Sequence, residues 1–579
     1  MASLFLRRSA HAMLAALVLA SQLAHAQDKP FNATAPVDER FIWDLTPLFA
    51  TPSHWEAERQ SVLADLPKLS ALKGSVANGD AQALLKALQA QSALWMRLSR
   101  LGVYASTQQS TDNRNPQYQE RGNLIRAVYG QARAAMAWLA PEIQSLGAAQ
   151  LEAMLAKEPG LAPHAVNLRD TLRQARHTLS ADTEAALGAM SPVSRAASQA
   201  RTLLMNSDIR WPSVTIDGKS QEVNPTSYGS LREHPNRAVR EQVFKAFYGQ
   251  LAQFESSLGS LLSSRMQAGT IEAKLRQHKN AISANLFADQ IPESVVRNLV
   301  AQAHAGLPVL HRYFKLRQRM LGLPDLHYHD IYPDLVKLDK PFNLEESVRL
   351  TTEATQVLGP QYQRHLKAGL TARSMHVFPA PGKSSGAYKT SVYRMTPYVF
   401  LNHQDTFNSA STVAHEWGHG VHSMLADEAQ PPENAGYALF TAEVAAITNE
   451  VLLSEMVKAQ AQTREEKLFY LGYALEQMRG TFFRQTMFAE FELAAHDALE
   501  RGEALGGKKL TQIYCGLLRK YHGTDQGVMK IDPAYCTEWA YIPHFFTPFY
   551  VYQYATSMAA ASHLCQAMLN RQQGWREKY

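Results

Sequence analysis

Cysteine is scarce in this chain, and its few cysteines are far apart. Only 3 of the 579 residues are cysteines, namely Cys515, Cys536 and Cys565. Because no two of them are close in sequence, a zinc site built from cysteine thiolates is disfavoured. We expect all three to be small, buried, hydrophobic side chains. One disulfide between two of them is the alternative that the sequence leaves open.

The chain also lacks long apolar runs and clusters of basic residues. After residue 26 it has no apolar stretch of about 18 residues, the length that a membrane-spanning helix requires. The formal net charge of +6 is small for 579 residues, and lysine and arginine are scattered among acidic residues. We therefore expect neither membrane insertion nor nucleic-acid binding.

Residues 1–26 have the composition of an export signal. Arg7 and Arg8 form a basic start, residues 13–23 are mostly apolar, and residues 24–26 (Ala-His-Ala) have the pattern of a cleavage site. The apolar segment is too short to span a bilayer. We expect a signal peptide that is removed on export, which places the mature chain in a bacterial periplasm. General secretion is favoured over a twin-arginine route, which the residues around the arginines fit poorly.

Helical patterns dominate the rest of the chain, whose length of 579 residues exceeds one ordinary core. Long stretches are rich in alanine, leucine, glutamine and arginine and poor in glycine and proline, as helices prefer. These stretches are residues 79–111, 114–140, 147–157, 180–206, 235–276 and 293–321, and one more helix begins at a capping box at Ser53. We expect a mainly α fold with an N-terminal helical region over residues 27–210 and a catalytic part over residues 211–579.

Strand patterns are few. Asp217-Gly218, between residues 213–216 and 221–223, predicts a β-hairpin. Residues 376–402 contain prolines, glycines and short apolar runs, which predicts a small sheet with a loop. This sheet would come directly before the most informative segment of the chain.

That segment is His415-Glu416-Trp417-Gly418-His419. Helical residues four apart lie on one face, so the two imidazoles can bind one zinc ion while Glu416 reaches a metal-bound water. Capping residues over 408–412 predict that the helix begins there, and it should end near residue 426, before two prolines. Gly418 costs a helix roughly 1 kcal/mol relative to alanine, so we expect another backbone or a substrate to approach it closely.

A catalytic zinc ion usually has three protein ligands, so a third residue is needed. Glu443 and Glu450 lie in an otherwise nearly apolar helical run and share one face. Burial of an unpaired carboxylate is unfavourable, but this objection disappears if Glu443 binds the metal and Glu450 orients a histidine. The alternative is an exposed acidic stripe. His422 is either a residue beside the ligands or substrate, or a hydrogen-bonded core histidine.

In these segments the sequence resembles the oligoendopeptidase F family of the thimet oligopeptidase clan, which are zinc peptidases. The matching segments are His415-Glu-Trp-Gly-His419-Gly-Val-His422, Ala442-Glu443-Val-Ala-Ala-Ile-Thr-Asn-Glu450, and residues 43–49, 386–388, 397–402 and 541–556. One departure is Ala446, where relatives often carry serine. The resemblance implies that His415, His419 and Glu443 bind one Zn²⁺ per chain. It also implies a helical zincin-type catalytic lobe with a small β-sheet, which the N-terminal region caps over a deep central channel.

The resemblance also implies residues that contact the substrate or the transition state. His544, Tyr550 and Tyr554 are candidate donors to the oxyanion that forms during hydrolysis, and Tyr552 competes with them. Tyr550 and Tyr554 share a face if the segment is helical, although an aromatic core stripe has the same pattern.

Upstream, four residues are candidate substrate contacts: Gly386, Tyr388, Tyr398 and Phe400. Residues 398–401 alternate in side-chain direction, so we expect their free edge to pair with an extended peptide by strand addition.

The motif and the resemblance together predict a zinc-dependent endopeptidase that hydrolyses short unfolded peptides, with Glu416 as the general base. Two alternatives stay open. A dipeptidyl carboxypeptidase of the same clan shares the zinc residues and adds a cation for the C-terminal carboxylate of the substrate. A non-catalytic periplasmic peptide-binding protein with a vestigial motif holds no zinc and hydrolyses nothing.

Overall fold

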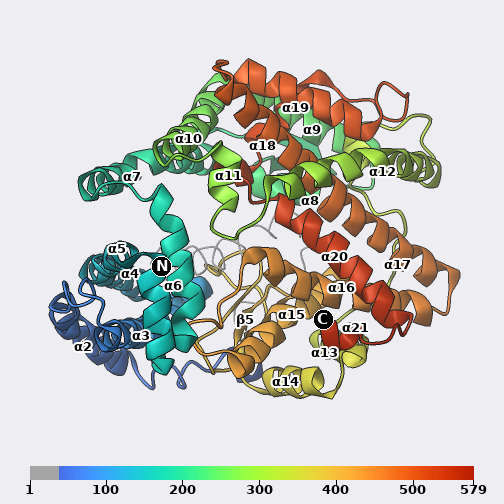
Figure 1. Cartoon of the computed structure of the whole chain (residues 1–579). Coiled ribbons are helices and arrows are strands. Elements are labelled where there is room, and N and C mark those ends of the chain that lie inside the picture. Colours follow the sequence, from blue (N-terminus) through green and yellow to red (C-terminus); the bar gives the residue numbers. More distant parts are fainter. Residues whose placement is uncertain (1–37) are drawn as a thin grey trace. The chain divides into compact units, whose positions relative to one another are not determined.

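The chain is described here by a computed structural model that covers residues 38–579. The expected signal peptide lies outside the described residues. The described part is mainly α-helical and has two small sheets (Figure 1), as the sequence predicts. Within residues 38–579, no helix combines the length and the hydropathy that crossing a membrane requires. The expected deep channel stays a prediction.

The chain forms two compact units, and each contains segments that are far apart in sequence. Unit 1 contains the described residues up to Arg176, Pro341–Leu453 and His563–Tyr579. Unit 2 contains His177–Lys340 and Ser454–Ser562. The boundary expected near residue 210 falls within unit 2, and the division into an N-terminal region and a catalytic part stays a prediction.

Unit 1 holds the N-terminal helices and the helix with the His-Glu-x-x-His motif. Its helices are α2 (Pro52–Ser70), α3 (Ala81–Thr111), α4 (Pro116–Met136), α5 (Leu139–Lys157), α6 (Ala165–Gln174), α13 (Leu344–Ala354), α14 (Pro360–Thr371), α15 (Phe407–Ala429), most of α16 (Leu439–Gln460), the end of α20 (Tyr552–Leu569) and α21 (Trp575–Lys578). The stretch predicted over 79–111 corresponds to α3 and that over 147–157 to the later part of α5, whereas that over 114–140 covers α4, a turn at residues 137–138 and the first residues of α5.

Local side chains set where these helices begin. Asn115 accepts hydrogen bonds from two backbone N–H groups of α4, and Pro116 occupies the first helical position. Thr51 caps α2, so the cap predicted at Ser53 is two residues too late. Gly147 has a φ of 71° inside α5 and kinks the helix at the residue where the predicted stretch 147–157 begins.

The predicted small sheet is present in unit 1. Its strand order is β3 (Met375–His376), β5 (Tyr398–Phe400), β4 (Tyr388–Thr390), so that β5 is the central strand. β5 is parallel to β3 and antiparallel to β4. Trp43 packs its ring against Tyr398 and Phe400, with ring centroids 6.1 and 5.9 Å apart. The N-terminal segment and the sheet therefore share one hydrophobic core.

Unit 2 is also helical. Its helices are α7 (Ala181–Leu203), α8 (Pro225–Leu231), α9 (Arg237–Gln253), α10 (Glu255–Leu275), α11 (Ala281–Leu286), α12 (Glu293–Met320), α17 (Arg464–Gln477), α18 (Gln485–Glu500) and α19 (Gly507–His522), with the end of α16 and most of α20. The predicted hairpin is confirmed as β1 (Ser213–Ile216) and β2 (Lys219–Glu222). The helical stretch predicted over 235–276 is confirmed and contains two helices, because Phe254 leaves helical geometry (φ −105°, ψ 10°) between α9 and α10.

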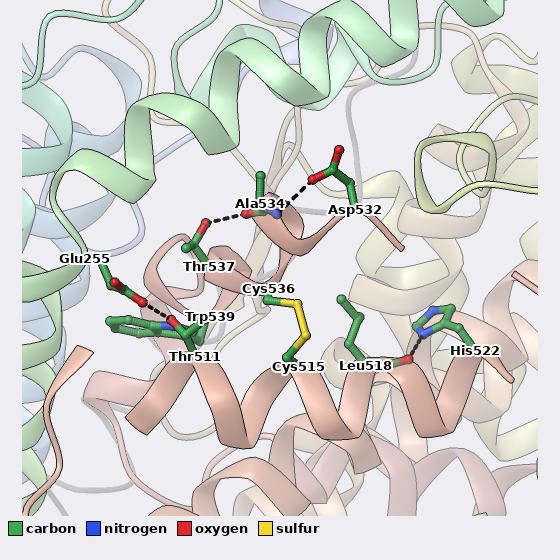
Figure 2. Close-up of a disulfide and its surroundings, with 10 residues drawn as sticks. All are labelled: Glu255, Thr511, Cys515, Leu518, His522, Asp532, Ala534, Cys536, Thr537 and Trp539. Atoms are coloured by element: carbon green, nitrogen blue, oxygen red, sulfur yellow. Dashed lines mark hydrogen bonds between the residues drawn. A yellow bond between two sulfur atoms is a disulfide. The ribbon is translucent and has the colours of Figure 1, made fainter. Parts of the chain in front are cut away.

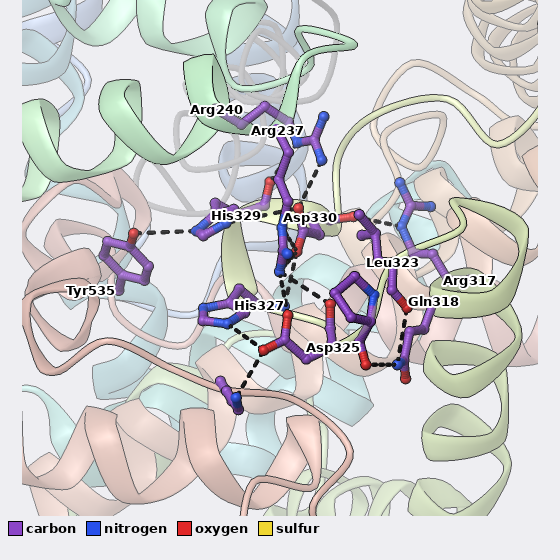
Figure 3. Close-up of polar contacts among 12 residues, drawn as sticks. Arg237, Arg240, Arg317, Gln318, Leu323, Asp325, His327, His329, Asp330 and Tyr535 are labelled. Atoms are coloured by element: carbon purple, nitrogen blue, oxygen red, sulfur yellow. Dashed lines mark hydrogen bonds and ion pairs between the residues drawn. The ribbon is translucent and has the colours of Figure 1, made fainter.

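Two buried carboxylates in unit 2 are paired with basic groups. Asp330 is 0% exposed and accepts hydrogen bonds from Arg237 and Arg240, the latter at 2.7 Å (Figure 3). Glu538 is also 0% exposed, and its partners are Tyr248, Tyr328, Arg484 and Tyr514. Such pairing offsets the desolvation of a buried charge.

Cys515 and Cys536 form a disulfide (Figure 2). It links α19 to the short 3-10 helix η9 (Pro533–Ala540), which packs against it. The expectation of three unbonded cysteines is therefore wrong, and the disulfide that the sequence left open is present. Cys565 is a buried thiol, with its Sγ 3.5 Å from the carbonyl oxygen of Thr448.

Candidate active site

Helix α15 carries the His-Glu-x-x-His motif through the core of unit 1. Thr406 caps it by accepting a hydrogen bond from the backbone N–H of Ser409, and the helix runs from Phe407 to Ala429. The start predicted at residues 408–412 is thus slightly late, and the end predicted near residue 426 is three residues early. Trp417 is 0% exposed and donates from Nε1 to the Sδ of Met375 at 3.3 Å, which fixes the motif against β3.

The two motif histidines meet Glu443 of the next helix, α16. The Nε2 of His415 lies 3.6 Å from Oε2 of Glu443, and the Nε2 of His419 lies 3.9 Å from Oε1. One ligand atom from each of the three residues lies within 4.8 Å of the others. Glu443 is 2% exposed, which contradicts the alternative of an exposed acidic stripe at this position.

Gly418 allows the two helices to come this close. A Cβ atom at Gly418 would lie 2.7 Å from the Cα of Ala446 and 2.8 Å from the carbonyl oxygen of Ala445. Real Cβ atoms do not make contacts this short with backbone, so a larger residue would push α16 away. The expectation that another backbone approaches Gly418 is confirmed.

Polar contacts fix the register between the helices. His415 donates from Nδ1 to the carboxylate of Glu450 of α16. This hydrogen bond turns Nε2 of the ring toward Glu443, as metal-binding histidines require. Asn449 donates to the carbonyl oxygen of Ala414 at 2.9 Å and accepts from the hydroxyl of Tyr362 at 2.9 Å. Asn449 was not identified from the sequence, although a buried amide in an apolar helix is itself a signal.

The donor atoms of this cluster fit a metal ion. Among residues 38–579, the Nε2 of His415 and Oε2 of Glu443 have no hydrogen-bond partner, although both are buried. Unpartnered buried polar atoms are costly, and a cation between them would remove that cost. Two imidazole nitrogens and one carboxylate are a donor set that zinc takes at catalytic sites, where the fourth position is left for water.

Electrostatics within the cluster are strongly coupled. Burial opposes a charge on His415, but the carboxylates of Glu450 and Glu443 outweigh it and raise the pKa of His415 to about 10. Burial lowers the pKa of His419 well below its usual range, so this imidazole is neutral and its lone pair is available to a metal.

Glu416 lies beside the ligands and is 1% exposed. Its Oε2 atom has no hydrogen-bond partner within residues 38–579. Burial raises the pKa of Glu416 to about 7, with the neighbouring His415 acting in the opposite direction. A carboxylate of this kind can accept a proton near neutral pH and return it, as a general base must.

His422 is one turn beyond the ligands and belongs to a small polar cluster. Its ring stacks on Tyr437 with centroids 3.8 Å apart, and burial lowers its pKa to about 4. Lys389 of β4 donates to Ser423 at 2.6 Å and to the hydroxyl of Tyr437 at 3.2 Å. Lys389 and Tyr437 were missed from the sequence because only the fold brings β4 against α15. His422 is thus a partly buried, neutral residue beside the cluster.

The strand residues predicted to contact substrate are placed differently from expectation. β5 pairs on both sides, so residues 398–401 have no free edge, and strand addition there is excluded. Phe400 is 0% and Tyr398 4% exposed, and both side chains pack in the core. The outer strand of the sheet on the α15 side is β4, which contains Tyr388 and contacts α15. Gly386, just before β4, accepts a hydrogen bond from Asn402 at 2.8 Å.

The C-terminal candidates lie in unit 2 and meet each other there. The rings of His544 and Tyr550 are stacked with centroids 6.2 Å apart, and the hydroxyls of Tyr550 and Tyr554 are 3.3 Å apart. α20 begins at Tyr552, so the contact between Tyr550 and Tyr554 forms although only Tyr554 is helical. Tyr552 is 1% exposed. Burial lowers the pKa of His544 to about 4, which keeps the imidazole neutral. The roles of these residues in catalysis stay predictions.

Comparison with known proteins shows the family of the chain and agrees with its fold. A family model described as "Peptidase family M3" matches residues 230–578, and one described as "Oligopeptidase F" matches residues 142–211. The oligopeptidase PepF of Bacillus subtilis is 35% identical over 529 residues, which are 91% of this chain and 78% of that protein. The group B oligopeptidase PepB of Streptococcus agalactiae is 32% identical over 94% of this chain and 90% of that protein.

Solved structures share the fold. The crystal structure of oligoendopeptidase-F from Enterococcus faecium aligns with a TM-score of 0.70 and 27% identity over 91% of each chain. A Chlamydophila abortus protein aligns with a TM-score of 0.83 and 29% identity over 94% of this chain and 91% of that one. The chain therefore belongs to peptidase family M3 and, within it, to the oligoendopeptidase F family that its motifs resemble.

Proposed function

We propose that this peptidase is a zinc-dependent endopeptidase that cleaves short, unfolded peptides. The observation that carries the proposal is the convergence of His415, His419 and Glu443 in the buried core of unit 1, with unpartnered nitrogen and oxygen atoms facing one another. One Zn²⁺ per chain fits this donor set. When bound, it supplies a Lewis acid for water and for the scissile carbonyl.

The residues around the cluster have separate roles in the proposed reaction. Glu416 accepts the proton of the attacking water at its unpartnered Oε2 and delivers it to the leaving amine. Its burial holds the pKa near 7, so the same group can both take up and release a proton. Glu450 bonds to the Nδ1 of His415 and so leaves Nε2 as the nitrogen that faces Glu443 and would bind the metal.

Substrate is held in extended form along the sheet. β4 is the outer strand next to α15, and an extended peptide can add to such an edge through main-chain hydrogen bonds. Main-chain pairing fixes the direction of the peptide and leaves side-chain preference broad. Tyr388 and Lys389 of β4, and Gly386 just before it, are therefore the residues closest to a bound peptide in this proposal.

His544, Tyr550 and Tyr554 complete the proposal as donors to the oxyanion. Their mutual contacts support a common role, because the three polar groups occur together in a buried setting. Removal of one such donor typically reduces kcat by about 100- to 1000-fold.

We further propose export to a bacterial periplasm, with short peptides from protein turnover as substrates. The Cys515–Cys536 disulfide supports this location, because disulfides persist in oxidising compartments and are rare in the cytosol. The composition of residues 1–26 supports it independently.

A quenched fluorescent nonapeptide tests the function. We expect hydrolysis that a chelator abolishes and that zinc restores, and we expect Glu416→Gln to retain the metal while losing nearly all activity. Activity of Glu416→Gln at the native level would refute the general base. Hydrolysis of no peptide, with no metal bound, would support the alternative of a peptide-binding protein.

A matched pair of peptides separates the endopeptidase from the dipeptidyl carboxypeptidase. The two substrates share one sequence and differ only in a free or an amidated C-terminus. Cleavage of both at internal bonds supports the endopeptidase, and refusal of the amidated peptide supports the carboxypeptidase. Mass spectrometry of the products identifies the bonds that are cut.

A further inference from the structure

The residue before Tyr550 has an unusual backbone conformation. Phe549 has a φ of 55°, in the left-handed region that residues with a Cβ atom rarely adopt. Phe549 is 4% exposed, so contacts with the surrounding protein must hold this conformation. The orientation of the Tyr550 side chain depends on the backbone conformation of Phe549, because consecutive residues share one peptide plane.

One buried carboxyl group holds the turn. Glu492 of α18 is 0% exposed, and its Oε1 accepts a hydrogen bond from the backbone N–H of Phe549 at 2.8 Å. Its Oε2 has no hydrogen-bond partner among residues 38–579. One turn further along α18, the ring of His496 lies 4.8 Å from the ring of Phe549. α18 therefore contacts both the backbone and the side chain of Phe549.

Two arginines hold the earlier part of the same segment. Arg201 of α7 donates to the carbonyl oxygen of Tyr541 at 2.7 Å, and Arg265 of α10 donates to that of Phe546 at 3.1 Å. These bonds fix the backbone on either side of His544. Three charged or ionisable side chains from three helices thus hydrogen-bond to the main chain of this segment, which is how a supporting scaffold acts.

The acceptor on Glu492 does not depend on its charge. Burial raises the pKa of Glu492 to about 8, so near neutral pH much of the group is the uncharged acid. An uncharged acid keeps a carbonyl oxygen that accepts the N–H of Phe549. A glutamine has the same acceptor and nearly the same shape.

We infer that Glu492 is a positioning residue: through the backbone of Phe549 it fixes the turn that sets the orientation of Tyr550. The inference rests on the proposed function, in which Tyr550 is a donor to the oxyanion. Glu492 does not touch the substrate. It acts because a displacement of about 1 Å in a catalytic group can reduce the rate by about 100-fold.

Three substitutions at Glu492 test this. Glu492→Gln keeps the acceptor and its reach, Glu492→Asp keeps the chemistry but shortens the side chain, and Glu492→Leu keeps the bulk without an acceptor. We expect the aspartate and leucine variants to lose kcat on the order of 100-fold with little change in KM. The glutamine variant should keep kcat close to native. Zinc content, measured in parallel, should be unchanged in all three.

A control on the same helix separates positioning from stability. Thr486 of α18 is 0% exposed and donates to the carbonyl oxygen of Phe482. Thr486→Val removes a buried hydrogen bond from α18 without touching Phe549. We expect it to lower the thermal unfolding midpoint and to leave kcat unchanged. If Glu492→Leu does not fold, the comparison of the glutamine and aspartate variants decides.

The outcomes are distinct. Native kcat in both the leucine and the aspartate variants would overturn the inference, as would a loss in the glutamine variant as large as that in the leucine variant. Absence of zinc-dependent hydrolysis by the native chain would overturn the proposed function itself. The inference is supported if the native chain is active, the Glu492→Asp variant loses kcat and the Glu492→Gln variant keeps it.

Discussion

A Cβ atom at Gly418 would lie 2.7 Å from the Cα of Ala446, so α15 and α16 are in backbone contact where the two histidines face Glu443. Helices normally pack with axes about 8–10 Å apart, and the shortest separations need glycine or another small residue at the contact. The absence of a Cβ atom at Gly418 therefore sets the separation of the two helices that carry the three candidate ligands.

Gly418→Ala should destabilise the protein and weaken zinc binding. Alanine gains up to about 1 kcal/mol of helix propensity, but an overpacked contact with rigid backbone typically costs about 1–3 kcal/mol, so the loss prevails. We expect a lower urea midpoint and weaker zinc affinity in a chelator competition. The control is Gly130→Ala in α4, where nothing lies within 4 Å of the added Cβ and stability should rise. Equal behaviour of the two variants would contradict the close contact.

Glu450→Leu should weaken zinc binding without removing a ligand. The hydrogen bond from the Nδ1 of His415 to Glu450 orients the imidazole, and loss of such a partner typically reduces metal affinity by about 10- to 100-fold. Competition with a colorimetric chelator measures the change. Glu455→Gln, on an exposed part of the same helix, serves as the control and should bind zinc as the native chain does.

Reduction of the Cys515–Cys536 disulfide should destabilise unit 2. The two cysteines are 21 residues apart, and closing a loop of this length in the unfolded chain corresponds to about 3 kcal/mol. We expect a reductant to lower the thermal midpoint of the native protein and to leave that of Cys515→Ser unchanged. Cys565→Val should respond to the reductant as the native chain does. A midpoint that does not respond would show that the bond is absent from the protein.

His522 should make stability depend on pH under mildly acidic conditions. Burial lowers its pKa to about 3 in the folded state, against 6.5 in an unfolded chain. Between these values the unfolded state binds more protons, so stability rises with pH and is lost as pH falls below about 6.5. Its Nδ1 bonds to the carbonyl oxygen of Leu518 at 2.8 Å, and the ring stacks on Phe314.

His522→Phe removes this titrating group and keeps an aromatic ring. Between pH 6.5 and pH 5, we expect the free energy of unfolding to fall less in the variant than in the native protein. The difference between the two falls should be at most about 2 kcal/mol. Denaturant titrations at several pH values measure the slope. An identical slope in the native protein and the variant would show that His522 does not titrate in this way.

What the sequence predicted well depends on local spacing. His415, Glu416 and His419 could be placed on one helical face because four residues make about one turn, and Asp217-Gly218 predicted its hairpin for an equally local reason. Glu443 is 24 residues from His419, and it was identified from the cost of burying a carboxylate and from the resemblance to a family, which the comparisons confirm.

What the sequence did not predict depends on contacts between distant segments. β5 lost its expected free edge because it pairs with β3, which is more than 20 residues upstream. The pairing of Cys515 with Cys536 requires the packing of α19 on η9. Lys389 joins Tyr437 only because β4 lies along α15. Thr406 was not recognised as the cap of α15, because several residues that can cap a helix follow it.

The metal content of the purified protein tests the proposed zinc site most directly. Inductively coupled plasma mass spectrometry should find about one zinc ion per native chain and none above background in Glu443→Ala, with the fold of the variant verified by circular dichroism. Native protein that holds no stoichiometric divalent cation, or Glu443→Ala that retains a full equivalent, would contradict a cation bound jointly by α15 and α16.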